Sequence, residues 1–94
     1  MQNVHITADH KIIREWVEAR GGIPCRILDS EAPTEDEGVL EIVFTKNLSK
    51  KFVQLNWSDF FKKFDQFHLA FEYEDNHEGE PISKYFKFLW RNGE

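Results

Sequence analysis

The sequence predicts an α+β domain in which two helices pack on one face of an antiparallel sheet of four or five strands. Two segments repeat apolar residues at helical spacing, strand-like alternation follows each of them, and an acidic loop interrupts each pair of strands. The predicted order is α-β-β-(β)-α-β-β, so helix, strand, acidic loop and strand occur twice. Ninety-four residues suit one hydrophobic core, and residues 1–94 are therefore expected to form a single domain.

The first helix is the clearest element of the pattern. Thr7 is the expected N-cap, and Asp9 in the first turn would favour the helix dipole. One apolar stripe has a period of about 3.6 residues and contains Ile12, Ile13, Trp16 and Val17. Gly21-Gly22 is expected to end the helix, because glycine adopts the left-handed conformation without a steric cost.

Strands are predicted at Ile23 to Leu28 and at Val39 to Phe44, with an acidic loop at residues 29 to 38 between them. Pro24 lacks an N–H donor, which indicates a strand start or a sheet edge. Alternation places the following residues on one face of each strand: Ile23, Cys25 and Ile27, then Leu40, Ile42 and Phe44. A short third strand is expected at Phe52 to Leu55.

The second helix is expected to begin after Asn56 as its N-cap, with Asp59 at the N3 position. Its wide apolar face contains Trp57, Phe60, Phe61, Phe64 and Phe67. Leu69 to Glu74 alternates as a strand, a second acidic loop covers residues 75 to 81, and Lys84 to Trp90 forms the last strand.

Aromatic side chains supply most of the predicted core, since nine Phe, three Trp and two Tyr occur in the chain. We expect Trp16 and Phe64 to be buried between their helices and the sheet. There they would contact Phe71, Phe86 or Phe88.

The net charge of −5 conceals a segregation of charge along the chain. Residues 29–41 and 72–80 hold eleven acidic residues and no basic one, which leaves six acidic residues against twelve Lys and Arg elsewhere. The simplest interpretation is two solvated loops that aid solubility. The functional alternative is a pair of acidic docking loops for a basic partner, formed by Asp29, Glu31, Glu35, Asp36, Glu37, Asp75, Glu78 and Glu80.

No pattern in the sequence indicates a catalytic, metal-binding or cofactor-binding site. Gly21-Gly22 follows a helix, whereas a phosphate-binding glycine loop opens one. Cys25 is expected to be a buried, unreactive thiol. The spacing of the four histidines does not match a zinc site: His5, His10, His68 and His77. We therefore expect no enzyme activity, no metal and no cofactor.

Exposed aromatic residues are the main candidates for an interaction surface, because such side chains concentrate binding energy at interfaces. The four candidates are Trp57, Tyr73, Tyr85 and Trp90. The alternative is a single-stranded nucleic-acid-binding domain that uses a basic, aromatic sheet face with Tyr85, Lys87 and Arg91. The acidic loops disfavour that alternative, since they repel phosphates.

Several motifs resemble those of a family of short bacterial proteins of unknown function. They are Asp9-His10-x-x-Ile13-x-x-Trp16-x-Glu18-x-Arg20-Gly21-Gly22-x-Pro24, Trp57-x-x-Phe60-Phe61-x-x-Phe64, Leu69-Ala70-Phe71 and Phe86-Lys87. The chain departs from that pattern in the more acidic residues 29–37 and the lysine-rich residues 46–51. Some members carry the label of glucan branching enzyme, but this chain lacks the length and the carboxylate motifs for that chemistry. The resemblance implies a bacterial stand-alone domain and assigns no functional residue.

Location and partners are inferred from what the sequence lacks. The first residues show no signal-peptide pattern, no apolar run approaches the roughly 20 residues of a membrane span, and Cys25 has no second cysteine. We expect a cytoplasmic protein without membrane contact, present as a monomer or weak homodimer. Its predicted function is that of a non-enzymatic interaction module for a protein partner.

Overall fold

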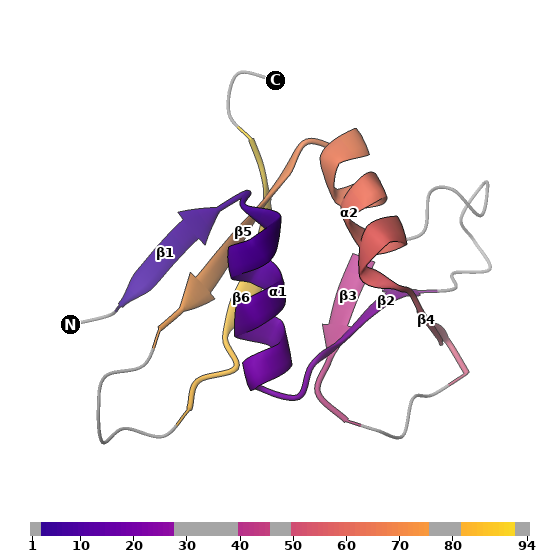
Figure 1. The fold of residues 1–94 in the computed structure, drawn as a ribbon, viewed down its shortest axis with the longest axis horizontal. Coiled ribbons are helices and arrows are strands. Elements are labelled where there is room, and N and C mark those ends of the chain that lie inside the picture. The colour runs from indigo at the N-terminus through magenta and orange to yellow at the C-terminus, as the bar shows by residue number, and fades with distance from the viewer. Residues whose placement is uncertain (1–2, 28–39, 46–49, 76–81, 92–94) are drawn as a thin grey trace.

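The described residues of the chain form two helices and six strands, arranged as two antiparallel three-stranded sheets (Figure 1). The computed structural model describes residues 3–27, 40–45, 50–75 and 82–91. The elements are β1 (Val4–Thr7), α1 (His10–Ala19), β2 (Ile23–Ile27), β3 (Leu40–Val43), β4 (Phe52–Gln54), α2 (Trp57–Gln66), β5 (Leu69–Glu74) and β6 (Phe86–Trp90). The predicted α+β class is confirmed. No helix within these ranges is both long and apolar enough to cross a membrane.

The strands form two sheets where the sequence predicted one. Sheet A has the order β1-β5-β6, and sheet B has the order β3-β2-β4. Aromatic side chains join them, because the ring of Phe44, just after β3, lies 5.8 Å from the ring of Phe86 in β6. The strand β1 was not predicted; its residues Val4–Thr7 pair with Phe71–Glu74 of β5.

Both helices begin at a side-chain cap. In α1 the cap is Asp9, whose carboxylate accepts hydrogen bonds from the N–H groups of Lys11 and Ile12. The expectation that Thr7 caps this helix is therefore wrong. Thr7 ends β1, and its hydroxyl accepts a hydrogen bond from the N–H of Asp9 at 3.0 Å. In α2 the predicted cap, Asn56, accepts from the N–H of Asp59 at 2.7 Å.

The core lies between the helices and the two sheets, with α1 over sheet A and α2 beside sheet B (Figure 1). The Trp16 ring lies 5.5 Å from the ring of Phe71, and the Phe64 ring lies 6.4 Å from that of Phe88. Both pairs confirm the predicted contacts. Phe64 is fully buried, and Trp16 is 5% exposed.

The predicted burial of Cys25 is confirmed, but its thiol lies outside this core. The core residue Ile42 lies directly opposite Pro24, so Pro24 is on the helix-facing side of β2. Cys25 therefore lies on the other side of the strand, opposite Glu41. Burial, and secondarily the charge of Glu41, raises the pKa of this thiol, which keeps it protonated at neutral pH.

The two halves of the chain have the same element order and are related by a shift of 47 residues, from Asp9 to Asn56. The shift relates the two N-caps, Asp9 and Asn56, and the two residues with positive φ that follow the helices, Gly21 and His68. It also relates fully buried helix residues, namely Ile13 to Phe60 and Val17 to Phe64. The first strand of each half pairs with the other half, β1 with β5 and β4 with β2. The fold is thus a pseudo-twofold pair of βαββ units that exchange their first strands.

Candidate functional site

The side of sheet A that faces away from the helices, here called the open face, combines apolar and acidic side chains. Because Tyr73 faces the core, alternation places Glu72 and Glu74 on the open face. Ile6 lies directly opposite Glu72, and Val4 lies opposite Glu74. Ile6 is 59% exposed and Val4 is 37% exposed. Within the described ranges, both helices pack on the other side of the sheet.

A shallow groove of about 430 Å³ on the open face is lined by Val4, Glu72, Glu74 and Tyr85. The Tyr85 hydroxyl donates a hydrogen bond to Glu72 Oε2, and this bond raises the pKa of Tyr85. Lys87 lies directly opposite Glu72 on β6. Neither Glu72 nor Glu74 forms an ion pair with a residue in the described ranges. The described lining of the groove therefore carries two carboxylates and no cation.

Two of the predicted interface aromatics are engaged inside the fold. Tyr73 is only 8% exposed, because its ring packs against that of Trp16 at 5.9 Å, so the expectation of an exposed Tyr73 is wrong. Trp57 is half-buried, and its indole N–H donates to Glu18 Oε2 at 3.1 Å. Neither side chain is arranged as a free anchor.

The other two predicted aromatics are exposed but lie apart. Tyr85 is 44% exposed in the acidic groove, just before β6 begins. Trp90 is 82% exposed at the far end of that strand, opposite Leu69. The four candidates therefore form no single surface, and only Tyr85 belongs to the open-face groove.

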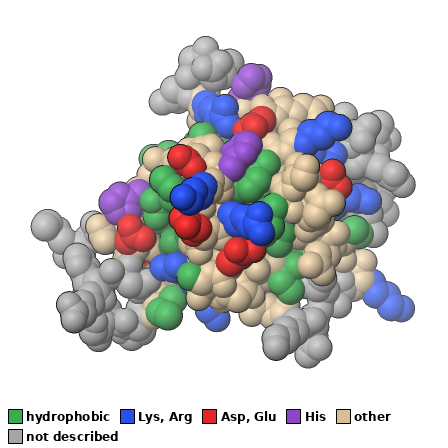
Figure 2. Space-filling view, viewed as in Figure 1, with side chains coloured by type: hydrophobic (Ala, Val, Ile, Leu, Met, Phe, Trp, Pro, Cys, Tyr) green, Lys and Arg blue, Asp and Glu red, His purple; other side chains and the backbone are tan. Residues whose placement is uncertain are grey.

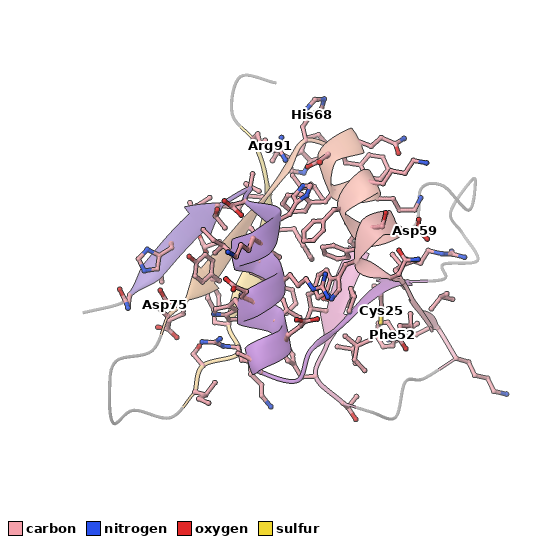
Figure 3. The ribbon with its side chains drawn as sticks, viewed as in Figure 1. Cys25, Phe52, Asp59, His68, Asp75 and Arg91 are labelled. Atoms are coloured by element: carbon pink, nitrogen blue, oxygen red, sulfur yellow. The ribbon has the colours of Figure 1, made fainter. Side chains whose placement is uncertain are left out.

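Most of the predicted acidic docking loops lie outside the described residues, namely Asp29, Glu31, Glu35, Asp36, Glu37, Glu78 and Glu80. Asp75, labelled in Figure 3, is described and ties β5 to β1. Its N–H donates to the carbonyl of Asn3 at 2.9 Å, and its carboxylate lies 3.3 Å from His5 Nε2. This part of the acidic segment continues directly from the strand that carries Glu72 and Glu74.

The basic and aromatic residues of the last strand do not form one platform. Arg91 donates from Nε to the carbonyl of Leu69 at 2.6 Å, and its guanidinium lies 5.6 Å from the centre of the Phe64 ring. Tyr85 and Lys87 lie beside Glu72 instead.

In the same described part of the chain, no group of three or more His, Cys, Asp or Glu could hold a metal ion.

Two reciprocal side-chain contacts, which sequence patterns did not reveal, join the helices. His10 Nε2 lies 2.9 Å from Asp65 Oδ2, and the Trp57 indole donates to Glu18. The shift of 47 residues relates His10 to Trp57 and Glu18 to Asp65, so the contacts are pseudo-equivalent. Burial alone would raise the pKa of Asp65, but hydrogen bonds from His10 and Arg91 hold it below its ordinary value.

Charges on the helix side of the molecule are mixed. Figure 2 shows acidic, basic and histidine side chains next to one another in the centre of this side. An example is the pair Arg14 and Glu18, one turn apart on α1, with Arg14 Nε 3.2 Å from Glu18 Oε2. Neither sign of charge dominates here, which distinguishes this side from the grooves.

A second groove, of about 320 Å³, lies between α2 and sheet B. Its described lining is mainly polar, and three of the lining residues are cations, namely Arg26, Lys62 and Lys63. The other lining residues are Leu55, Asp59 and Gln66. Sequence patterns do not reveal this groove, because Arg26 lies in a predicted strand, whereas Lys62 and Lys63 lie outside the predicted apolar face of the second helix. Only the packing of α2 beside β2 brings these residues together.

In the described residues, the chain is a small α+β protein with internal pseudo-twofold symmetry, one acidic groove and one cationic groove. We compared the chain with protein-family models, curated proteins and solved structures, and none of them matches.

Proposed function

We propose that the protein is a non-enzymatic interaction module whose open face binds a basic segment of a partner protein. The observation that carries the proposal is the groove in which the Glu72 and Glu74 carboxylates lie beside the exposed side chains of Val4 and Tyr85. Apolar area supplies binding energy, and matched charge supplies specificity and a fast encounter. A partner segment with lysine or arginine next to an apolar residue fits this lining.

The charge of the surrounding sequence supports a basic partner. Residues 72–80 contain five acidic residues and no basic one, so the negative charge of the groove continues along the chain. Lys87 lies opposite Glu72 alone, so one lysine is next to a groove lined by two carboxylates. The groove is open and shallow, which suits an extended peptide better than an enclosed small molecule.

Two peptides of equal length test the proposal, one rich in lysine and leucine and one rich in glutamate and leucine. In NMR titrations, the basic peptide is expected to shift the amide signals of β1, β5 and β6, and the acidic peptide to leave them in place. We expect Glu72→Gln combined with Glu74→Gln to weaken binding by about tenfold or more, equivalent to about 1.4 kcal/mol.

The matched control is Glu15→Gln, which removes one carboxylate from the exposed side of α1. This variant should bind the basic peptide like the parent protein. Equal binding of both peptides, or shifts confined to other elements, would overturn the proposal. A salt-dependent response to single-stranded DNA that exceeds the peptide response would favour a nucleic-acid partner instead.

A further inference from the structure

The cationic groove occupies a position that is filled in the other half of the molecule. The shift of 47 residues relates Trp16 to Lys63 and Tyr73 to Arg26. Over sheet A, the Trp16 indole of α1 packs on the Tyr73 ring of β5 and closes the space between helix and sheet. At the equivalent place in the other half, Lys63 and Arg26 line an open groove between α2 and β2.

The place of Arg26 is unusual for a charged side chain. It lies on the central strand of sheet B, between Leu40 and Val53, and on the same side as the core residue Leu40. Arg26 is half-buried, and it forms no ion pair with a described residue. Desolvating a cation costs free energy unless an anion or a hydrogen-bond acceptor offsets the loss of water.

Among the described residues that line the groove, three are cations and one is a carboxylate. Asp59 lies three and four residues before Lys62 and Lys63 on α2, the spacing at which opposite charges attract. The described lining residues therefore carry a formal charge of +2. Such a lining attracts a dianion, and a bound dianion would relieve the repulsion between Arg26 and the two lysines.

We propose that this groove binds the phosphate group of a small phosphomonoester. The guanidinium of Arg26 offers paired N–H donors that match phosphate oxygens, and the ammonium groups of Lys62 and Lys63 add point charges. The Gln66 amide is a further donor at the edge of the groove. A volume of about 320 Å³ accommodates one small ligand. The net charge of −5 opposes a polyanion, because long nucleic acids bind through many phosphate contacts.

Titrations with inorganic phosphate, glycerol 3-phosphate and a short oligothymidylate test this assignment at constant ionic strength. At about pH 7.5, where a phosphomonoester is mostly dianionic, glycerol 3-phosphate should shift the amide signals of Arg26 and α2. Arg26→Gln should weaken this binding by about tenfold or more. Lys11→Gln, which removes a cation from the exposed side of α1, should leave the affinity unchanged.

The proposal is overturned if neither phosphate compound gives a response, or if the oligothymidylate gives a stronger response than glycerol 3-phosphate. A response to inorganic phosphate alone, without one to the monoester, would also overturn it. These titrations are independent of the peptide titrations, since none of the described lining residues is common to the two grooves.

A second variant separates loss of binding from loss of folding. Arg26→Tyr combined with Lys63→Trp rebuilds the aromatic pair of the other half, and is expected to abolish the phosphate response while the melting temperature stays the same or rises. If the double variant folds and still binds glycerol 3-phosphate like the parent protein, the groove is not the site.

Discussion

The two helix–sheet contacts of this protein occupy positions related by the shift of 47 residues and differ in chemistry. Over sheet A, Trp16 packs on Tyr73 with 5.9 Å between the ring centres. At the equivalent place beside sheet B, Lys63 and Arg26 line a groove. The positions that remain apolar in both halves are deeper, such as Val17 and Phe64, which are fully buried.

This difference separates the residues that determine the fold from those that are available for binding. Helix caps, one turn of buried helix residues and a left-handed residue after each helix occur in both halves. These features define the helix of each βαββ unit, namely where it begins, which side it buries and where it ends. The outer layer of the contact tolerates either an aromatic pair or a pair of cations.

The largest expected effect is on the aromatic pair itself. Trp16→Ala should lower the free energy of unfolding by about 3–5 kcal/mol, because it removes a buried indole that contacts Phe71 and Tyr73. The equivalent change, Lys63→Ala, should alter stability by no more than about 0.5 kcal/mol. Urea unfolding of both variants measures the difference. Equal losses would show that the two contacts contribute alike and would contradict the comparison.

Gly22 explains why the aromatic residues at the ends of the two hairpins, Phe44 and Trp90, differ in burial. Phe44 packs against Trp16 and lies close to Gly22, where an added Cβ would come within 2.7 Å of Val17 Cγ1 and 2.9 Å of Ile42 Cγ2. At the equivalent place in sheet A, Leu69 lies opposite Trp90, and Trp90 is 82% exposed. The missing side chain at Gly22 therefore lets the Phe44 ring fold inward.

Gly22→Ala is accordingly expected to destabilise the protein by about 1–3 kcal/mol, because the added methyl group overpacks the core. Gly21→Asn is the control, since Gly21 has a φ of 72° but nothing lies within 4 Å of an added Cβ. Asparagine tolerates this backbone region, so the control variant should have a clearly higher melting temperature than Gly22→Ala. The reverse order would contradict the role assigned to Gly22.

The smallest expected effect concerns the reciprocal contacts between the helices. Asp65→Asn should cost about 0.5–1 kcal/mol at neutral pH, because the carboxylate is half-exposed and its pairs with His10 and Arg91 are partly screened. The pKa of Asp65 is lower in the folded state than its ordinary value of about 3.9. Its contribution to the free energy of unfolding is therefore fully present above that ordinary value and is lost as the pH falls through the lowered pKa. Urea unfolding at acidic and neutral pH should therefore show the variant and parent converging on acidification. Glu18→Gln, the pseudo-equivalent change, keeps a hydrogen-bond acceptor for the Trp57 indole and serves as the reference. A loss that stays constant with pH would exclude this linkage.

Helices and most strands could be predicted because their periodicity is strong. The segment Leu69–Glu74 was assigned with the observed bounds, and the Asn56 cap was identified correctly. The strand β1 was missed because Val4–Thr7 has no buried residue, so its sequence carries no core-facing alternation. Its partner is also remote in sequence, since it pairs with β5.

The grooves were less predictable, because each depends on residues from several elements. Glu72 and Glu74 were recognised as acidic, but the apolar lining from Val4 required knowledge of β1. The proximity of Arg26 to α2 follows from tertiary packing and leaves no local pattern. Alternation places Tyr73 on the same face as the core residue Phe71, so its burial could have been predicted. The sequence does not reveal that the Trp16 ring packs against the tyrosine ring.

The exchange of first strands has a consequence for how the chain acquires its structure. On the ribosome, β1 emerges early, whereas its partner β5 belongs to the second half of the sequence. Until most of the chain has been synthesised, the backbone groups of β1 and the side chain of Ile6 have no native partner. Such sequence-distant pairing raises contact order and slows folding relative to a chain of local hairpins. Neither βαββ unit can close its own sheet, so assembly of the two halves and folding of each half become a single event.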